Sequence, residues 1–251
     1  MTDGLRYMVL NQNATLYAPI NVDLIVTSPP YALGKEYGAR SDDDAVLTWR
    51  VTMINWLKMA FTHSFKGTRL AVNVPLDTTK NGLRPVYAHL VNMAAVAGWS
   101  YRFTIIWLEE NISKKRARGS VMRASAPHVI APCEMIAVFW KGSKGDWPLP
   151  DKSFTMEKDE WMGLTDGVWR VRGESRPYGG HPAAWPVEIP RRLIRLLSVP
   201  GALVCDPFCG SGTTGVAALQ EERRFVGIDI EKKWCEVSKR RLEEVVASGG
   251  H

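Results

Sequence analysis

The chain has 251 residues, of which 45% are hydrophobic and 23% are charged. These proportions exclude a disordered or fibrous chain, and the length favours one large α/β domain over two small ones. The net charge of +6 fits a polyanionic partner and fits equally a basic enzyme that acts on small molecules. The four cysteines lack zinc-type spacing, and no apolar run approaches the roughly 18 residues of a membrane span. We therefore expect a cytoplasmic protein without disulfides, metal or membrane contact.

Strands and helices alternate along most of the chain. Apolar, β-branched runs predict strands over residues 22–27, 70–74, 101–107, 134–140, 202–205 and 224–228. Apolar residues at helical spacing predict helices over residues 46–60, 85–97 and 189–197, from residue 213, and over 232–246. Such alternation predicts a mostly parallel sheet with helices on both faces.

Two segments interrupt this alternation. Residues 111–123 contain five basic and no acidic residues, so we expect an exposed loop there. Residues 141–178 are rich in Gly, Pro, Trp and charge and have weak periodicity. We therefore predict one domain made of residues 1–140 and 179–251, with residues 141–178 as a small insertion.

Gly210, Gly212 and Gly215 form a G-x-G-x-x-G loop between a predicted strand and a predicted helix. By itself this motif fits a dinucleotide-binding enzyme or a plain tight turn. Asp206 ends the strand before the glycines, where a carboxylate would repel a pyrophosphate but suits the ammonium group of S-adenosylmethionine. Asp229 ends the next predicted strand, where it can accept both hydroxyls of a ribose. Too few residues follow Gly215 to complete a sheet, so the other strands must come from upstream.

A second loop, Ser28-Pro29-Pro30-Tyr31, follows the strand over residues 22–27. It lies at the carboxyl end of that strand, the side on which open α/β sheets bind ligands. The prolines fix a backbone carbonyl, the serine adds a hydroxyl, and Tyr31 offers a flat face for stacking. Hydrogen bonds to an exocyclic amino group can favour the pyramidal nitrogen that attacks a methyl group. A strand followed by an ordinary Pro-Pro turn is the alternative interpretation.

Together these loops resemble the amino-group DNA methyltransferases of the permuted β order. The resemblance covers residues 22–246, and its matching segments are 28–31, 181–183, 190–194, 206–214 and 227–229, with further similarity at 106–107 and 134–141. It implies a Rossmann-like, S-adenosylmethionine-dependent methyltransferase sheet with circularly permuted motif order and a target-recognition insertion in residues 141–178.

The resemblance also implies functional residues. The implied catalytic and base-contacting residues are Ser28, Pro29, Pro30 and Tyr31, and the implied cofactor contacts are Asp206, Phe208, Gly210, Gly212, Thr213, Asp229, His181 and Pro182. The family often has His or Tyr before a Glu at the place where this chain has Cys133-Glu134, so Glu134 fits an ordinary edge residue as well as a functional one. Because direct methyl transfer needs no covalent enzyme intermediate, we expect Cys209 to pack beside the glycines rather than to react.

The implied reaction is methyl transfer from S-adenosylmethionine to the N4 amino group of a cytosine flipped out of double-stranded DNA. In this family a Ser before Pro-Pro-Tyr accompanies mostly N4-cytosine methylation, whereas Asp accompanies mostly N6-adenine methylation. The alternatives are an N6-adenine or RNA methyltransferase of the same fold and a non-catalytic nucleic-acid-binding partner subunit. A nicotinamide dehydrogenase is disfavoured by Asp206.

We expect two segments to contact DNA. Five basic side chains in residues 111–123 suit phosphates, namely Lys114, Lys115, Arg116, Arg118 and Arg123. In the insertion, Arg170, Arg172 and Arg176 can read guanine edges, although its tryptophans also fit a small subdomain core. DNA binding would place the protein at the nucleoid. The sequence leaves open whether a cognate restriction endonuclease or a homodimer provides further partners.

Overall fold

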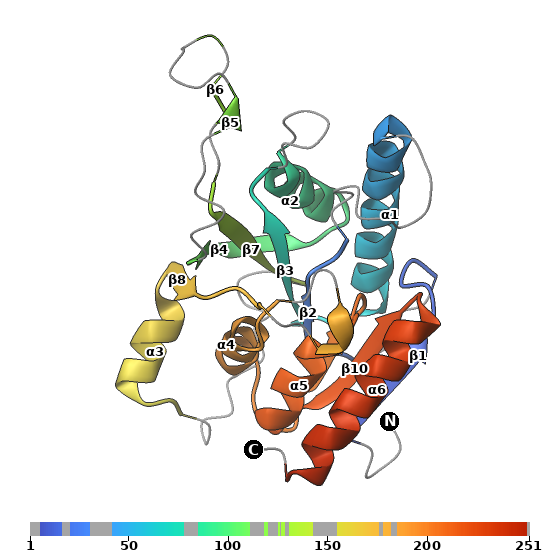
Figure 1. Ribbon diagram of the computed structural model, residues 1–251, viewed down its shortest axis with the longest axis vertical. Coiled ribbons are helices and arrows are strands. Elements are labelled where there is room, and N and C mark those ends of the chain that lie inside the picture. Colours follow the sequence, from blue (N-terminus) through green and yellow to red (C-terminus); the bar gives the residue numbers. More distant parts are fainter. Residues whose placement is uncertain are drawn as a thin grey trace.

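The computed structural model describes residues 6–16, 21–30, 42–77, 85–110, 118–119, 125, 127–128, 131–142, 155–175, 178–181 and 185–249. Its centre is an eight-stranded sheet in the order β1-β10-β9-β2-β3-β7-β4-β8 (Figure 1). The strands are β1 (Tyr7–Asn11), β2 (Leu24–Thr27), β3 (Arg69–Pro75), β4 (Ser100–Glu109), β7 (Cys133–Trp140), β8 (Val168–Val171), β9 (Leu203–Asp206) and β10 (Arg224–Asp229). The helices are α1 (Asp42–His63), α2 (Val86–Val96), α3 (Lys158–Thr165), α4 (Glu188–Leu197), α5 (Thr213–Gln220) and α6 (Lys232–Ala247).

The sheet is mostly parallel, as the alternation of strands and helices predicts. Strands β1, β10, β9, β2 and β3 run parallel to their neighbours in that order, and β8 runs parallel to β4. Strand β7 runs antiparallel to both β3 and β4. The carboxyl ends of β2, β3, β9 and β10 therefore share one edge of the sheet, which is where open α/β sheets bind ligands.

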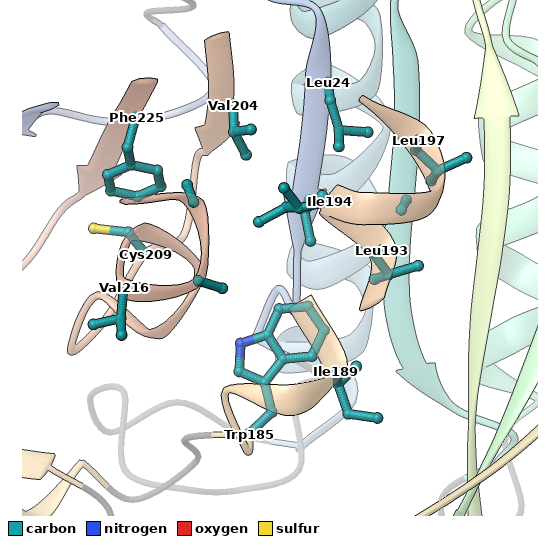
Figure 2. Packing of buried hydrophobic residues seen from close by; sticks show 14 of the residues in the cluster. Leu24, Trp185, Ile189, Leu193, Ile194, Leu197, Val204, Cys209, Val216 and Phe225 are labelled. Atoms are coloured by element: carbon teal, nitrogen blue, oxygen red, sulfur yellow. The ribbon is translucent and has the colours of Figure 1, made fainter. Parts of the chain in front are cut away.

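Each face of the sheet is covered by its own apolar cluster. Strand β2 is buried along its whole length, and its side chains alternate between the two clusters, as expected for a strand with helices on both sides. Helices α1 and α2 cover one face with side chains such as Trp56 and Leu90. Helices α4, α5 and α6 cover the other face, and Figure 2 shows Ile194 of α4 beside Leu24 of β2.

The structure adds elements that the sequence analysis does not predict. Strand β1 pairs in parallel with β10 at one edge of the sheet. Helix α3 and strand β8 lie within residues 141–178, and β8 pairs with β4 at the opposite edge. The inserted segment therefore contributes to the main sheet, and the proposed division of the chain into segments stays a prediction.

The expected exposed loop over residues 111–123 is described only in part. Its residues Arg118–Gly119 form β5, which pairs antiparallel with β6 (Pro127–His128), and the expected exposure of this segment stays a prediction. Lys114, Lys115, Arg116 and Arg123 lie outside the described residues. In the part of the chain that the structure describes, no helix is both long and apolar enough to cross a membrane.

Candidate active site

The glycine loop joins β9 to α5 and has little room for side chains. Gly210 and Gly212 have φ angles of +49° and +80°, in the left-handed region that favours glycine. A Cβ atom on Gly212 would lie 2.4 Å from the Oγ atom of Ser238, and one on Gly210 would lie 2.7 Å from Nε2 of His181. The loop therefore passes directly against helix α6 and the ring of His181, so both positions require glycine.

Asp229, at the end of β10, holds this loop through backbone hydrogen bonds. Its Oδ2 atom accepts from the backbone N–H of Gly210 at 2.8 Å, and Oδ1 accepts from the N–H of Glu231 at 2.9 Å. Burial raises the pKa of Asp229, and the two backbone donors oppose that rise. Each oxygen retains a further lone pair, so the carboxylate can still accept ligand hydroxyls.

Aromatic side chains lie on both sides of the glycine loop. The ring of Phe208 meets Trp56 of α1 edge-on, with centroids 5.2 Å apart. The ring of His181 meets Trp234 of α6 edge-on, with centroids 4.4 Å apart. The predicted cofactor residues Phe208, His181 and the glycines thus gather in one place, whereas Pro182 lies outside the described residues.

Arg241 of α6 supports the loop, a contact that the sequence analysis does not predict. Its Nη1 atom donates to the hydroxyl of Thr213 at 3.0 Å and to the backbone carbonyl of Ser211 at 3.2 Å. The guanidinium also lies over the ring of Tyr178, 5.0 Å from its centroid, and burial lowers its pKa. The predicted cofactor residue Thr213 therefore has its hydroxyl directed to α6 in this structure.

Asp206 lies between the two predicted loops and is only 2% exposed. Its Oδ1 atom accepts from the hydroxyl of Thr27 at 2.7 Å and from the backbone N–H of Phe208 at 3.1 Å. Its Oδ2 atom accepts from the hydroxyl of Thr214 at 2.5 Å. Burial raises the pKa of Asp206 to about 6, although these hydrogen bonds lower it and Asp229 adds a smaller rise. The predicted contact of Asp206 with the cofactor ammonium group stays a prediction.

The Ser28-Pro29-Pro30 segment begins where β2 ends, and Pro29 is buried. The carbonyl of Pro30 accepts a hydrogen bond from Nε1 of Trp49 in α1 at 2.7 Å, which fixes the course of the chain after the prolines. Tyr31 lies outside the described residues.

Two further polar side chains lie beside Ser28. Asn73, fully buried in β3, directs its Nδ2 atom to Oγ of Ser28 at 3.5 Å and to Oε2 of Glu134 at 2.5 Å. Glu134, near the start of β7, therefore belongs to the polar group around the Ser28-Pro29-Pro30 segment. Its position opposite Pro75 in the β3–β7 pairing brings it to this edge, a relation that local sequence does not reveal.

The predicted DNA-contacting residues Arg170 and Arg172 lie in and directly after β8, where exposed side chains alternate with buried ones. Arg170 and Arg172 are exposed, whereas Trp169, next to Arg170 in β8, is 1% exposed and packs in the main apolar cluster. Trp161 of α3 is 49% exposed. Trp169 is thus a core residue of the sheet itself, and Arg176 lies outside the described residues.

Comparison with known proteins identifies the family. The DNA methylase family N6_N4_Mtase matches residues 22–240. The chain belongs to this family. The methylase is 44% identical to the type II methyltransferase M.MjaVI of Methanocaldococcus jannaschii over 160 residues, which cover 62% of this chain and 79% of that protein. It is 25% identical to the DNA adenine methyltransferase YhdJ of Escherichia coli K12 over 237 residues, which cover 89% of this chain and 76% of that protein.

Solved structures share the fold of the methylase. TTHA0409 of Thermus thermophilus, complexed with S-adenosyl-L-methionine, matches with a TM-score of 0.75 at 20% identity over 96% of the methylase and 93% of that chain. The cytosine-N4-specific PvuII DNA methyltransferase matches with a TM-score of 0.69 at 16% identity over 96% of the methylase and 90% of that chain. The predicted Rossmann-like methyltransferase fold is therefore confirmed.

Proposed function

We propose that this DNA methylase transfers a methyl group from S-adenosylmethionine to the N4 amino group of cytosine at a specific site in DNA. The observation that most supports methyl transfer is the direct link between the Ser28-Pro29-Pro30 segment and the glycine loop. Thr27, the residue before Ser28, donates to Asp206 at the start of the glycine loop at 2.7 Å. A base held at Ser28 and a cofactor held at the glycine loop would therefore be neighbours.

S-adenosylmethionine is the cofactor, and the described residues fit it. Gly210 and Gly212 have left-handed φ angles that let the loop turn closely after β9 beside the ring of His181, where the cofactor would lie. Asp229, at the end of the adjacent strand, offers carboxylate oxygens for ribose hydroxyls. When bound, the cofactor supplies an electrophilic methyl group. Asp229, Phe208, Gly210, Gly212, Thr213 and His181, with Pro182, would line its site.

Ser28 and Pro29 would hold the amino group of the target base. The Pro30 carbonyl already accepts from Nε1 of Trp49, so we propose that the Pro29 carbonyl accepts one amino proton. The Ser28 hydroxyl can accept the second proton, and Tyr31 would stack on the ring. A base inside a duplex cannot reach this segment, so the target must be flipped out. The rate would come mainly from alignment of nitrogen and methyl group.

DNA would be held by basic residues of two further segments. The exposed Arg170 and Arg172 of the insertion, with Arg176, would contribute to sequence recognition. Lys114, Lys115, Arg116, Arg118 and Arg123 would contact phosphates and position the duplex.

Cytosine is favoured over adenine because Ser28 stands where adenine-directed members of the family mostly have Asp. An N6-adenine methyltransferase is the second candidate, supported by the 25% identity to YhdJ over 89% of this chain. A non-catalytic subunit is disfavoured, since the serine loop and the glycine loop are both complete.

Replacement of Ser28 tests whether this segment acts in catalysis. We expect Ser28→Ala to lower kcat about tenfold or more and to leave the Kd values for DNA and cofactor within about threefold, because the lost contact acts on the reacting nitrogen. Ser64→Ala is the matched control, since the buried Ser64 hydroxyl donates to the Ala60 carbonyl at the end of α1. Unchanged turnover of Ser28→Ala would contradict the proposed site.

A further inference from the structure

The target-base segment (Ser28-Pro29-Pro30) and the cofactor loop (the glycine loop between β9 and α5) follow the paired strands β2 and β9. Within the described residues of the two strands, β2 pairs with β9 at Leu24 with Val204 and at Ile25 with Cys205. Beyond these pairs the connection is made by side chains. The Thr27 hydroxyl donates to Oδ1 of Asp206 at 2.7 Å, between the last residues of β2 and β9.

The same carboxylate also holds the far side of the cofactor loop. Its Oδ2 atom accepts from the hydroxyl of Thr214 in the first turn of α5 at 2.5 Å, and Oδ1 also accepts from the N–H of Phe208. Thr27 and Thr214 are 0% exposed and Asp206 is 2% exposed. One buried carboxylate therefore joins the end of β2, the turn after β9 and the start of α5.

We propose that Asp206 is a positioning residue, which sets the target-base segment against the cofactor loop through the Thr27 and Thr214 hydroxyls and governs turnover rather than cofactor affinity. This inference rests on the proposed function, because it assumes that a methyl group passes between the two loops. Transfer requires close alignment of the acceptor nitrogen with the methyl group, and displacements of about 1 Å can cost about a hundredfold in rate. A short, buried link between the two loops is the contact most suited to that task.

The ionised form of Asp206 is the form that accepts all three hydrogen bonds. Its pKa of about 6 places its protonation just below neutral pH. Among the described residues, the titratable groups that act on it are Asp229 of β10 and the thiols of Cys205 and Cys209. Burial raises the pKa of both thiols, so they stay neutral and Asp229 is the charged neighbour. Protonation of Asp206 would require at least one of its donors to reorient and would loosen the link.

Substitution of Thr27 tests the link. Thr27→Val removes the hydroxyl and keeps the shape, so we expect kcat to fall about tenfold, with the Kd for S-adenosylmethionine within about threefold. Because the Thr27 bond lowers the pKa of Asp206, its loss should move the acidic limb of kcat upward by about one pH unit. The same shift should occur in the pH dependence of thermal unfolding without cofactor. Thr27→Ser should restore both properties.

Thr68→Val is the matched control at the opposite end of the sheet, where β2 and β3 begin. The Thr68 hydroxyl is also buried and donates to the Val22 carbonyl at 2.8 Å, just before β2. We expect this variant to lose stability but to keep the wild-type kcat and acidic limb. Equal effects of Thr27→Val and Thr68→Val on kcat would overturn the inference.

Asp206→Asn provides a second test that does not depend on the folding of Thr27→Val. We expect a reduced kcat without an acidic limb, and a Kd for S-adenosylmethionine within about threefold of wild type. A loss of cofactor affinity of about tenfold or more, with a normal kcat at saturation, would overturn the inference in favour of a direct cofactor contact. Failure of the wild-type protein to methylate DNA would instead contradict the proposed function, so the two failures are distinguishable.

Discussion

The two ends of the central sheet bury polar side chains in different ways. At the carboxyl end, side chains bond to each other between elements that are distant in sequence. Thr27 and Asp206 are 179 residues apart, and Asn73 and Glu134 are 61 apart. These groups lie beside the two loops that we assign to the target base and the cofactor.

At the amino end, buried polar side chains bond mainly to the backbone. The Thr68 hydroxyl donates to the Val22 carbonyl at 2.8 Å, and the partly buried Asp23 accepts from the N–H of Leu203 at 2.7 Å. Arg223 donates to the carbonyl of Ser198 at 2.7 Å and to that of Glu221, and its Nε atom also donates to the Ser198 hydroxyl at 3.1 Å.

Buried polar side chains therefore have different roles at the two ends of the sheet. Backbone partners fix the path of the chain where strands begin, and their loss should affect stability alone. Contacts between side chains at the carboxyl end include a carboxylate with a raised pKa, so they can respond to pH and to ligands. Substitutions at the amino end should therefore change stability without changing turnover, whereas those at the carboxyl end should change turnover.

Gly212→Ala should have the largest effect. Its Cβ atom would lie 2.4 Å from Oγ and 3.1 Å from Cβ of Ser238, and the φ angle of +80° is unfavourable for alanine. We expect a loss of about 3–5 kcal/mol in the free energy of unfolding, measured by chemical denaturation. Ser238→Gly in the same chain should recover part of that loss. The control Gly163→Ala in α3 has nothing within 4 Å of its Cβ and should be neutral or slightly stabilising.

Arg223→Met tests the amino end. Burial lowers the pKa of Arg223 to about 10, so it remains charged at neutral pH and holds two carbonyls. We expect a loss of about 2–4 kcal/mol in the free energy of unfolding, because both carbonyls lose their donor. Turnover per folded molecule should match wild type. The neighbouring Arg224 is exposed, so Arg224→Met should change stability by less than about 0.5 kcal/mol. A reduced kcat in Arg223→Met would remove the distinction between the two ends.

Asp206→Asn should show the opposite pattern, with gained stability and lost turnover. The pKa of this carboxyl is about 6 in the fold, above the roughly 3.9 of an unfolded chain, so folding disfavours the ionised form. The contribution of the Asp206 carboxyl to the free energy of unfolding is fully present below pH 4 and is lost as the pH rises through 6. We expect the variant to be about 2–3 kcal/mol more stable than wild type at pH 8 and similar near pH 4. Thermal unfolding across this range measures the effect, and lower stability at both pH values would contradict it.

Thr68→Val should have the smallest effect. It removes one buried hydroxyl that donates to a backbone carbonyl, so we expect a loss of about 1 kcal/mol in the free energy of unfolding. Denaturation and steady-state kinetics on the same preparation would measure both properties. A change in kcat beyond about twofold would count against a purely structural role for the amino end.

The parts of the fold that were predictable carry a strong local pattern. Strand β2 is predictable from an apolar run, and the glycine loop before α5 is predictable from its closely spaced glycines. Strand β1 is a short edge strand with mixed burial, and β8 follows a polar segment of weak periodicity, so neither has such a pattern.

The residues of the site were predictable only where a contiguous motif contains them. Asp206, Gly210 and Asp229 stand in such segments, and the structure brings them together. The links of Asp206 to Thr27 and of Asn73 to Glu134 depend on strand order and register, which sequence spacing does not encode.

Identification of the methylated nucleoside tests the proposed activity most directly. Unmodified DNA would be incubated with the purified methylase and S-adenosylmethionine, digested to nucleosides and analysed by mass spectrometry. The Ser28→Ala variant would be treated in the same way for comparison. We expect N4-methylcytosine in the wild-type sample and a strongly reduced amount in the Ser28→Ala sample. N6-methyladenine without N4-methylcytosine would contradict the assignment of the base, and no modified nucleoside would contradict the proposed activity.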